Sequence, residues 1–190
     1  MKALRDGDVH AVSVVTLTTV SYFLVLENVV MILIRKLVNL LKKTHQESTY
    51  NLMYKKYQIS NTKFFRGRCS EIYGEGRFEA SENSYCGNYC TFQVVKGHKI
   101  TIGKDVAISH NVRFYTQNRS SKHFITGIGP EKQSGDITIG NRVWIGANVF
   151  INQNITVGNH VVIGANSVVT KNIPDNCVVV GAPAMIIKKY

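Results

Sequence analysis

A six-residue repeat between Ile137 and Val169 constrains the fold of this chain more than any other feature. One position of the repeat always holds an aliphatic residue, and its occupants are Ile139, Ile145, Ile151, Val157, Ile163 and Val169. The position two residues earlier is small or aliphatic as well. A helix buries a residue about every 3.6 positions and a strand every second one, so neither explains this period. A solenoid does, because each repeat can form a short strand and a turn on one side of a triangular coil.

The repeat predicts which side chains point inward and where the chain turns. We expect both aliphatic positions to face the inside of the coil. The residue after the second one, such as Gly140, Gly146 or Asn152, is expected to turn the corner with a positive φ, which glycine and asparagine adopt at low cost. The repeat is lost over residues 116–136, a polar segment that we expect to protrude as a loop. Long excursions from a regular fold are usually functional or disordered.

The first 65 residues do not follow the repeat. We therefore predict an N-terminal helical segment and linker over residues 1–65 and a repeat domain over residues 66–190. Residues 9–26 carry no charge apart from His10 and are just long enough to span a membrane. A start at Met31 would instead make residues 1–30 a translation artefact.

Residues 29–43 form a second apolar run that contains Arg35, Lys36, Lys42 and Lys43. Three interpretations remain open for the N-terminal segment: a membrane anchor with its basic side in the cytoplasm, an amphipathic helix over residues 29–43 at the membrane surface, and a helix packed on the end of the solenoid. A secretory signal is disfavoured because Asp6 and Asp8 stand where a basic region is needed.

The net charge of +11 predicts an anionic partner, such as coenzyme A, a charged glycan or a membrane surface. Nucleic acid is disfavoured because no nucleic-acid-binding motif accompanies the charge. Cys86 and Cys90 fit inward positions of an early coil and are interpreted as small buried side chains. No second close cysteine pair completes a zinc site, so no metal is predicted. Reduced thiols indicate a cytoplasmic protein, associated with the inner face of the membrane if residues 29–43 contact it.

Three segments narrow the prediction to a family. Residues 143–149, 163–174 and 180–184 resemble the maltose/galactoside O-acetyltransferase group of the hexapeptide-repeat acyltransferases, which includes enzymes that modify capsule, lipopolysaccharide and exopolysaccharide sugars. The resemblance implies a mainly β protein that folds as a left-handed parallel β-helix. It also implies a homotrimer with active sites between adjacent subunits and acetyl-CoA as the acyl donor.

The resemblance also implies which residues bind acetyl-CoA. The matched positions are Trp144, Ala147, Ala165, Thr170 and Lys171. Small residues at the two alanine positions would let the cofactor approach the backbone closely. The family often has a basic residue where this chain has Met185, and Lys188 is a candidate to replace it.

The reaction needs a general base, because an alcohol must lose its proton as it attacks the thioester, and histidine suits this near neutral pH. The family places this histidine where the present chain reads Gln117-Asn118-Arg119. Two substitutes are His110, on a corner of the coil, and His123, in the excursion. A rigid scaffold positions a base better than a loop does, which favours His110.

The basic residues Lys96, Arg113 and Arg119 are candidates for binding the acceptor. Arginine pairs with carboxylates in a bidentate manner, so we expect an acidic glycan. The expected function is an acetyl-CoA-dependent O-acetyltransferase that acts on a sugar or surface polysaccharide. Two alternatives are N-acetylation of an amino-sugar nucleotide and, because the family histidine is missing, a solenoid scaffold without catalytic activity.

Overall fold

The computed structural model describes residues 6–190 of the backbone and the side chains from Leu26 onward. The chain divides into two compact units, one ending at Glu47 and the other comprising Ser48–Tyr190. The second unit begins earlier than the boundary after residue 65 that the sequence suggested. The reason is that Tyr50 and Tyr57 are buried in its core, where the Tyr50 ring stacks on Phe65 with the centroids 4.7 Å apart.

Helix α1 extends over Asp6–Lys56. Its apolar side chains from Leu26 to Leu41 are exposed, and so are the basic side chains among them. Among the described residues, no helix is long and apolar enough to cross a membrane. The membrane-anchor interpretation of residues 9–26 lies outside the residues whose side chains are described. The last turns of α1 pack on the first coil of the second unit, where the Tyr50 hydroxyl donates to the Gly67 carbonyl at 3.0 Å.

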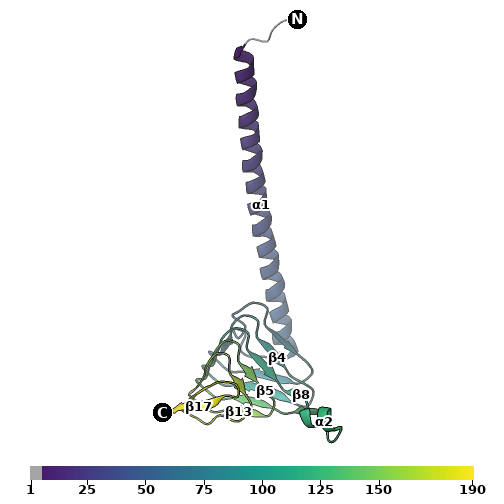
Figure 1. Ribbon diagram of the computed structural model, residues 1–190. Helices are drawn as coiled ribbons and strands as arrows, with labels where there is room; N and C mark the ends of the chain where they lie inside the picture. Colours follow the sequence, from purple (N-terminus) through teal and green to yellow (C-terminus); the bar gives the residue numbers. More distant parts are fainter. Residues whose placement is uncertain (1–5) are drawn as a thin grey trace. The chain divides into compact units, whose positions relative to one another are not determined.

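The second unit is a left-handed parallel β-helix with three faces, as predicted (Figure 1). Face 1 consists of β1 (Glu71–Tyr73), β4 (Thr91–Gln93), β7 (Arg113–Tyr115), β12 (Phe150–Ile151) and β15 (Val168–Val169). Face 2 consists of β2 (Arg77–Ala80), β5 (Lys99–Ile102), β10 (Ile137–Ile139) and β13 (Ile155–Val157). Face 3 consists of β3 (Tyr85–Cys86), β6 (Ala107–Ile108), β11 (Trp144–Ile145), β14 (Val161–Ile163) and β16 (Cys177–Val180), with β17 (Met185–Lys189) antiparallel at its end.

The chain visits the faces in the order 1, 2, 3, so three edges carry the turns. We call them edge 1–2, edge 2–3 and edge 3–1 after the faces that they connect. Residues that stack on each other in neighbouring coils are 18 positions apart in the sequence where no insertion lies between them, as for Asn148 and Asn166. They are 37 apart where the excursion lies between them, as for Asn111 and Asn148. The insertion therefore leaves the stacking of the coils intact.

Both aliphatic positions of the repeat are buried, which confirms the predicted inward faces. Cys86 and Cys90 are buried in the same core, as predicted. In the first coils the core is aromatic, and its rings belong to Phe64, Phe78, Phe92 and Phe114. Each ring lies within about 6 Å of a neighbour, a distance at which aromatic pairs attract each other.

The predicted role of the glycines is wrong. The positive φ angles lie two residues further along, at 55° for Arg142, 59° for Asn148 and 59° for Asn166. Gly140 and Gly146 are needed for another reason, namely the close approach of successive coils. A Cβ atom on Gly140 would lie 2.6 Å from the carbonyl oxygen of Gly158, which is closer than real Cβ contacts.

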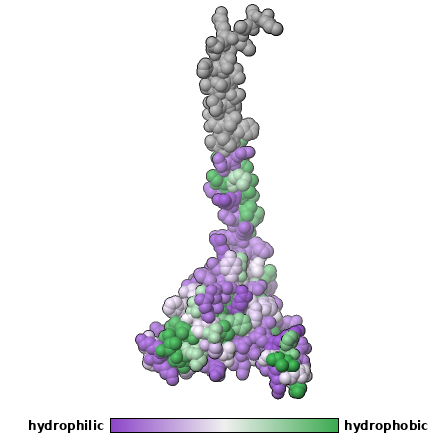
Figure 2. All heavy atoms as spheres, viewed as in Figure 1, coloured by the Kyte–Doolittle hydropathy of each residue, from purple (hydrophilic) through white to green (hydrophobic). Residues whose placement is uncertain are grey.

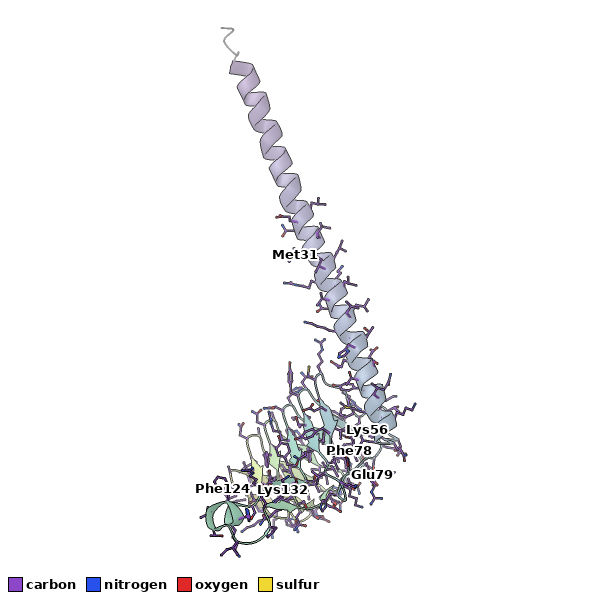
Figure 3. The ribbon with its side chains drawn as sticks, turned by 90° about the vertical axis from the view of Figure 1, so that its right-hand side faces the viewer. Met31, Lys56, Phe78, Glu79, Phe124 and Lys132 are labelled. Carbon is purple, nitrogen blue, oxygen red and sulfur yellow. The ribbon has the colours of Figure 1, made fainter. Side chains whose placement is uncertain are left out.

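The excursion over residues 116–136 is ordered. It forms strand β8 (Gln117–Arg119), helix α2 (Ser121–Thr126) and strand β9 (Lys132–Ser134), and β8 and β9 pair as a hairpin. Asn118 ties it to the next coil by donating to the side-chain oxygens of Asn152 and Gln153. Its apolar side chains Phe124, Ile125 and Ile128 are exposed. Figure 3 labels Phe124 on α2, and Figure 2 shows hydrophobic surface in this region.

We predict that Gly140→Ala destabilises the β-helix by about 1–3 kcal/mol, because the added methyl group forces the coils apart. Arg142→Gly should leave stability unchanged or raise it by up to roughly 1 kcal/mol, because it relieves a left-handed backbone. Thermal melting of both variants checks this. A larger loss for Arg142→Gly than for Gly140→Ala would contradict the corrected roles.

Candidate active site

The β-helix distributes the predicted site residues over different edges of one chain. His110, Ala147 and Ala165 lie on edge 3–1, between β6 and β7, β11 and β12, and β14 and β15 respectively. Edge 1–2 carries Lys96, Thr170, Lys171 and the excursion with Arg119 and His123. We call the three-sided β-helix of one chain a prism. Within one prism, the predicted cofactor residues Ala147 and Ala165 therefore lie on a different edge from Thr170 and Lys171.

His110 takes part in a ladder of side-chain caps along edge 3–1. The backbone N–H of Arg68 donates to Asn88 Oδ1 at 2.8 Å, and the N–H of Asn88 donates to His110 Nδ1 at 2.8 Å. A backbone N–H only donates, so Nδ1 must carry the lone pair and the proton of neutral imidazole lies on Nε2. His110 therefore has its basic nitrogen engaged, and Nε2 presents a donor.

This ladder stops below His110, because the next two residues of the edge are Ala147 and Ala165, which have no capping atom. Within the described part of the chain, the N–H groups of His110, Ala147 and Ala165 have no hydrogen-bond acceptor. On edge 2–3 the caps continue from the second coil to the last; they run from the N–H of Lys104 to Asn141, from that of Asn141 to Asn159 and from that of Asn159 to Asp175. Edge 3–1 is thus left with a row of stacked, open donors.

Trp144 and Lys188 lie on face 3, beside this row. The Trp144 side chain is 57% exposed on β11, whose neighbours place it between Ala107 and Val162. The Lys188 ammonium on β17 lies 4.4 Å from the centroid of the Tyr190 ring. An exposed indole of this size next to unpaired backbone donors is suited to contact with an amphipathic ligand.

His123 shows the opposite tautomer to His110. Its Nδ1 lies 2.7 Å from the carbonyl oxygen of Gly129, which only accepts, so Nδ1 donates and Nε2 carries the lone pair. A cavity of about 220 Å³ adjoins it, lined by Arg119, Ser120, His123, Phe124 and Glu131. The Arg119 guanidinium is 3.8 Å from the Glu131 carboxylate, so part of its charge is already paired within the excursion.

The predicted acceptor residues do not form one group. Arg113 lies at the start of β7 and donates to Asn111 Oδ1 at 3.0 Å, next to edge 3–1. Lys96 and Arg119 lie on edge 1–2, where Thr116 Oγ1 and Gln93 Oε1 connect the turn before β5 to the base of the excursion. Only Lys96 and Arg119 of the three are therefore neighbours along one edge.

The structure also reveals a cluster that the sequence analysis missed. His98 Nδ1 lies 2.9 Å from Asp136 Oδ1, and His98 Nε2 lies 2.9 Å from Ser134 Oγ. Partial burial pushes the pKa of Asp136 upward, but hydrogen bonds from His98 and the Lys99 N–H outweigh it and lower the pKa. A signal was present, because the phrase Ile-Thr-Ile-Gly occurs after both His98 and Asp136 and the two phrases pair as β5 and β10.

The fold and the edges define a hexapeptide-repeat protein with the layout of an acyltransferase. Residues 136–171 match the family described as bacterial transferase hexapeptide (six repeats). The chain is 32% identical to a galactoside acetyltransferase solved in complex with coenzyme A, with a TM-score of 0.60, over 73% of this chain and 68% of that one. The chain therefore belongs to the hexapeptide-repeat acyltransferases.

Two relatives from Escherichia coli K12 agree with this assignment. WbbJ, whose name assigns it to lipopolysaccharide biosynthesis as an O-acetyl transferase, is 38% identical over 128 residues, 63% of this chain and 64% of its own length. Galactoside O-acetyltransferase is 40% identical over 116 residues, 59% of this chain and 57% of its own length. The matched region thus spans less than two thirds of either relative.

We predict that His110 acts as a cap. His110→Asn should keep the melting temperature close to that of the wild type, because Asn88 already shows that an amide oxygen can accept a backbone N–H on this edge. His110→Ala should cost about 1 kcal/mol of stability, because the Asn88 N–H loses its acceptor. Equal melting temperatures for the two variants would show that the cap contributes nothing.

Proposed function

We propose that this protein is an acetyl-CoA-dependent O-acetyltransferase that acts on a sugar or surface polysaccharide. The observation that carries the proposal is the row of open N–H groups at His110, Ala147 and Ala165. Membership in the acyltransferase family and the coenzyme A complex of the galactoside acetyltransferase support the same ligand class.

The open row suits the pantetheine arm of an acyl-CoA. This arm is long and narrow and carries two amide groups whose carbonyls need donors. Polar backbone groups lose free energy when they are covered without a partner, so a ligand on this edge must supply acceptors. The alanine side chains leave room for it, and Trp144 offers an apolar surface beside it. Thr170, Lys171 and Lys188 remain the predicted contacts for the more polar end of the donor.

Complete sites require more than one copy of the chain. The open N–H groups lie on edge 3–1 and the candidate bases lie on edge 1–2. A groove between edge 3–1 of one copy and edge 1–2 of another would therefore bring the N–H groups and a base together. The exposed apolar tip of the excursion, with Phe124 exposed by 74% and Ile125 by 79%, is suited to contact with a second copy. A homotrimer closes such head-to-tail contacts, because each copy offers both edges.

In the proposed reaction the acceptor oxygen attacks the thioester carbonyl carbon, and a histidine takes the hydroxyl proton. The C–S bond then breaks, and the thiolate leaves as coenzyme A after it receives a proton. Of the two bases predicted from the sequence, His123 has a free Nε2 lone pair, whereas His110 has its lone pair bound to the Asn88 N–H. Hydrogen bonding therefore favours His123 over His110 as the base. This reverses the sequence-based preference for His110, which rested on the rigidity of the coil.

The function is tested by incubating the purified protein with acetyl-CoA and a panel of neutral glycans, acidic glycans and amino-sugar nucleotides. Release of free thiol with a glycan, and an acetyl ester in the product, is the expected result. Preference for acidic glycans, weakened by Lys96→Ala or Arg119→Ala, would support the acidic acceptor. An amide product would favour the alternative N-acetyltransferase, and absence of donor binding would favour the scaffold.

We predict that Ala165→Asn weakens acetyl-CoA binding at least tenfold. Its amide oxygen would cap the Ala147 N–H as Asn88 caps Arg68, which removes a donor and fills the groove. The melting temperature should stay the same or rise, because the change adds a hydrogen bond. Calorimetric titration with acetyl-CoA measures the effect, and Asn159→Ala on edge 2–3 is the matched control. Unchanged affinity in Ala165→Asn would contradict donor binding on edge 3–1.

Contact of residues 29–43 with an anionic membrane surface, and a cytoplasmic location at its inner face, stay predictions. The exposed side chains of Ile34, Leu37, Val38 and Leu41 support such contact, because they are unlike those of an ordinary solvated helix. Flotation with anionic vesicles tests it. Equal flotation of the wild type and Leu37→Asp would contradict it.

A further inference from the structure

His98, Asp136 and Ser134 form a hydrogen-bonded chain at the base of the excursion. Asp136 is ionised at neutral pH, since its pKa is lowered, and an ionised carboxylate only accepts. His98 Nδ1 therefore donates to Asp136, and Nε2 accepts from the Ser134 hydroxyl. A histidine oriented by a carboxylate on one nitrogen and bound to a hydroxyl on the other is the arrangement that activates oxygen nucleophiles.

The position of His98 is fixed by the β-helix. Its backbone N–H donates to the Val95 carbonyl at 3.1 Å, and its carbonyl accepts from the Arg77 N–H at 3.0 Å. It directly precedes β5, and Asp136 directly precedes the paired strand β10. His123, by comparison, belongs to a six-residue helix in the excursion and has only a neutral carbonyl as its Nδ1 partner. A carboxylate stabilises an imidazolium far better than a carbonyl does.

The surroundings of His98 contain charged groups of both signs. The charged residues on the adjoining strands and turns are Glu75, Arg77, Glu79, Lys96, Lys99, Lys132 and Asp136. Of the three acidic residues, Asp136 is the one hydrogen-bonded to His98, and Lys99 adds positive charge close to it. The His98 side chain is 28% exposed, so a ligand can reach it while most of the ring stays held.

We propose that His98 is the general base of the acetyl transfer and that Asp136 is its positioning residue. The assignment rests on the proposed function. The Ser134 hydroxyl marks the place that the acceptor hydroxyl takes when the acceptor is bound. There His98 Nε2 removes the acceptor proton as the oxygen attacks the thioester carbonyl, the C–S bond breaks, and the protonated His98 returns the proton to the leaving thiolate. No bond to the protein forms.

The test compares His98→Gln, Asp136→Asn and Ser134→Ala with the wild type and with His160→Asn, a control on edge 2–3. His98→Gln should lower kcat about 100-fold or more, with the acetyl-CoA Kd within about twofold and the same oligomeric state. Ser134→Ala should keep kcat within about threefold, since the acceptor replaces this hydroxyl. His160→Asn should behave as the wild type.

Asp136→Asn has a separate expected signature. The amide oxygen can still accept from the Lys99 N–H and from His98 Nδ1, so the tautomer is kept, but the negative charge that faces the imidazole is lost, which lowers kcat by about tenfold or more. Loss of the carboxylate also disfavours the imidazolium, so the pH at which kcat/KM falls on the acidic side should move lower. A purely structural clamp would lower the melting temperature without moving this pH.

The outcomes separate the two proposals. Normal transfer by folded His98→Gln, or loss of transfer only in His123→Gln, would overturn the assignment and leave the acetyltransferase function standing. An acetyl group found on Ser134 by mass spectrometry would overturn direct transfer at this site. If the wild type bound no acetyl-CoA, the proposed function would fail, and the assignment of His98 with it.

Discussion

Close stacking of the coils through backbone hydrogen bonds determines the remaining features of this β-helix. The N–H groups of Gly140, Gly146 and Gly158 each reach a carbonyl of the next coil at 2.8 Å. This spacing leaves no room for a Cβ atom at Gly140, Gly146 or Gly158, and it packs the aliphatic positions into a narrow core. Polar backbone groups remain available where an edge lacks a capping side chain. The candidate site for the acyl donor is therefore the part of edge 3–1 in which the caps end after His110.

The three edges differ because their residues differ in capping ability. Edge 2–3 is sealed by Asn141, Asn159 and Asp175, whereas edge 3–1 loses its caps where alanine follows His110. Edge 1–2 accommodates the excursion, and with it the chain from Asp136 through His98 to Ser134. One β-helix of this kind thus holds the candidate site for the acyl donor and the candidate base on separate edges.

The six-residue period was sufficient to predict the core, because burial follows directly from position in the repeat. It failed for the turns, because a glycine can be required by close packing as well as by a positive φ, and only coordinates separate the two. The roles of His110 and His123 depend on which nitrogen meets a donor or an acceptor, which no spacing reveals. His98 could have been found, since the matching phrases after His98 and Asp136 indicate adjacent strands.

Strand β17 reverses direction at the end of face 3 and pairs antiparallel with β16. A parallel β-helix without such a reversal would end in an open row of strand edges, which invites another molecule to continue the stack. The reversed strand covers this row along face 3 and brings Lys188 and Lys189 to the end of the molecule. A second prism that tried to add there would meet like charges and the wrong chain direction. Growth of a fibre from this end is thereby discouraged.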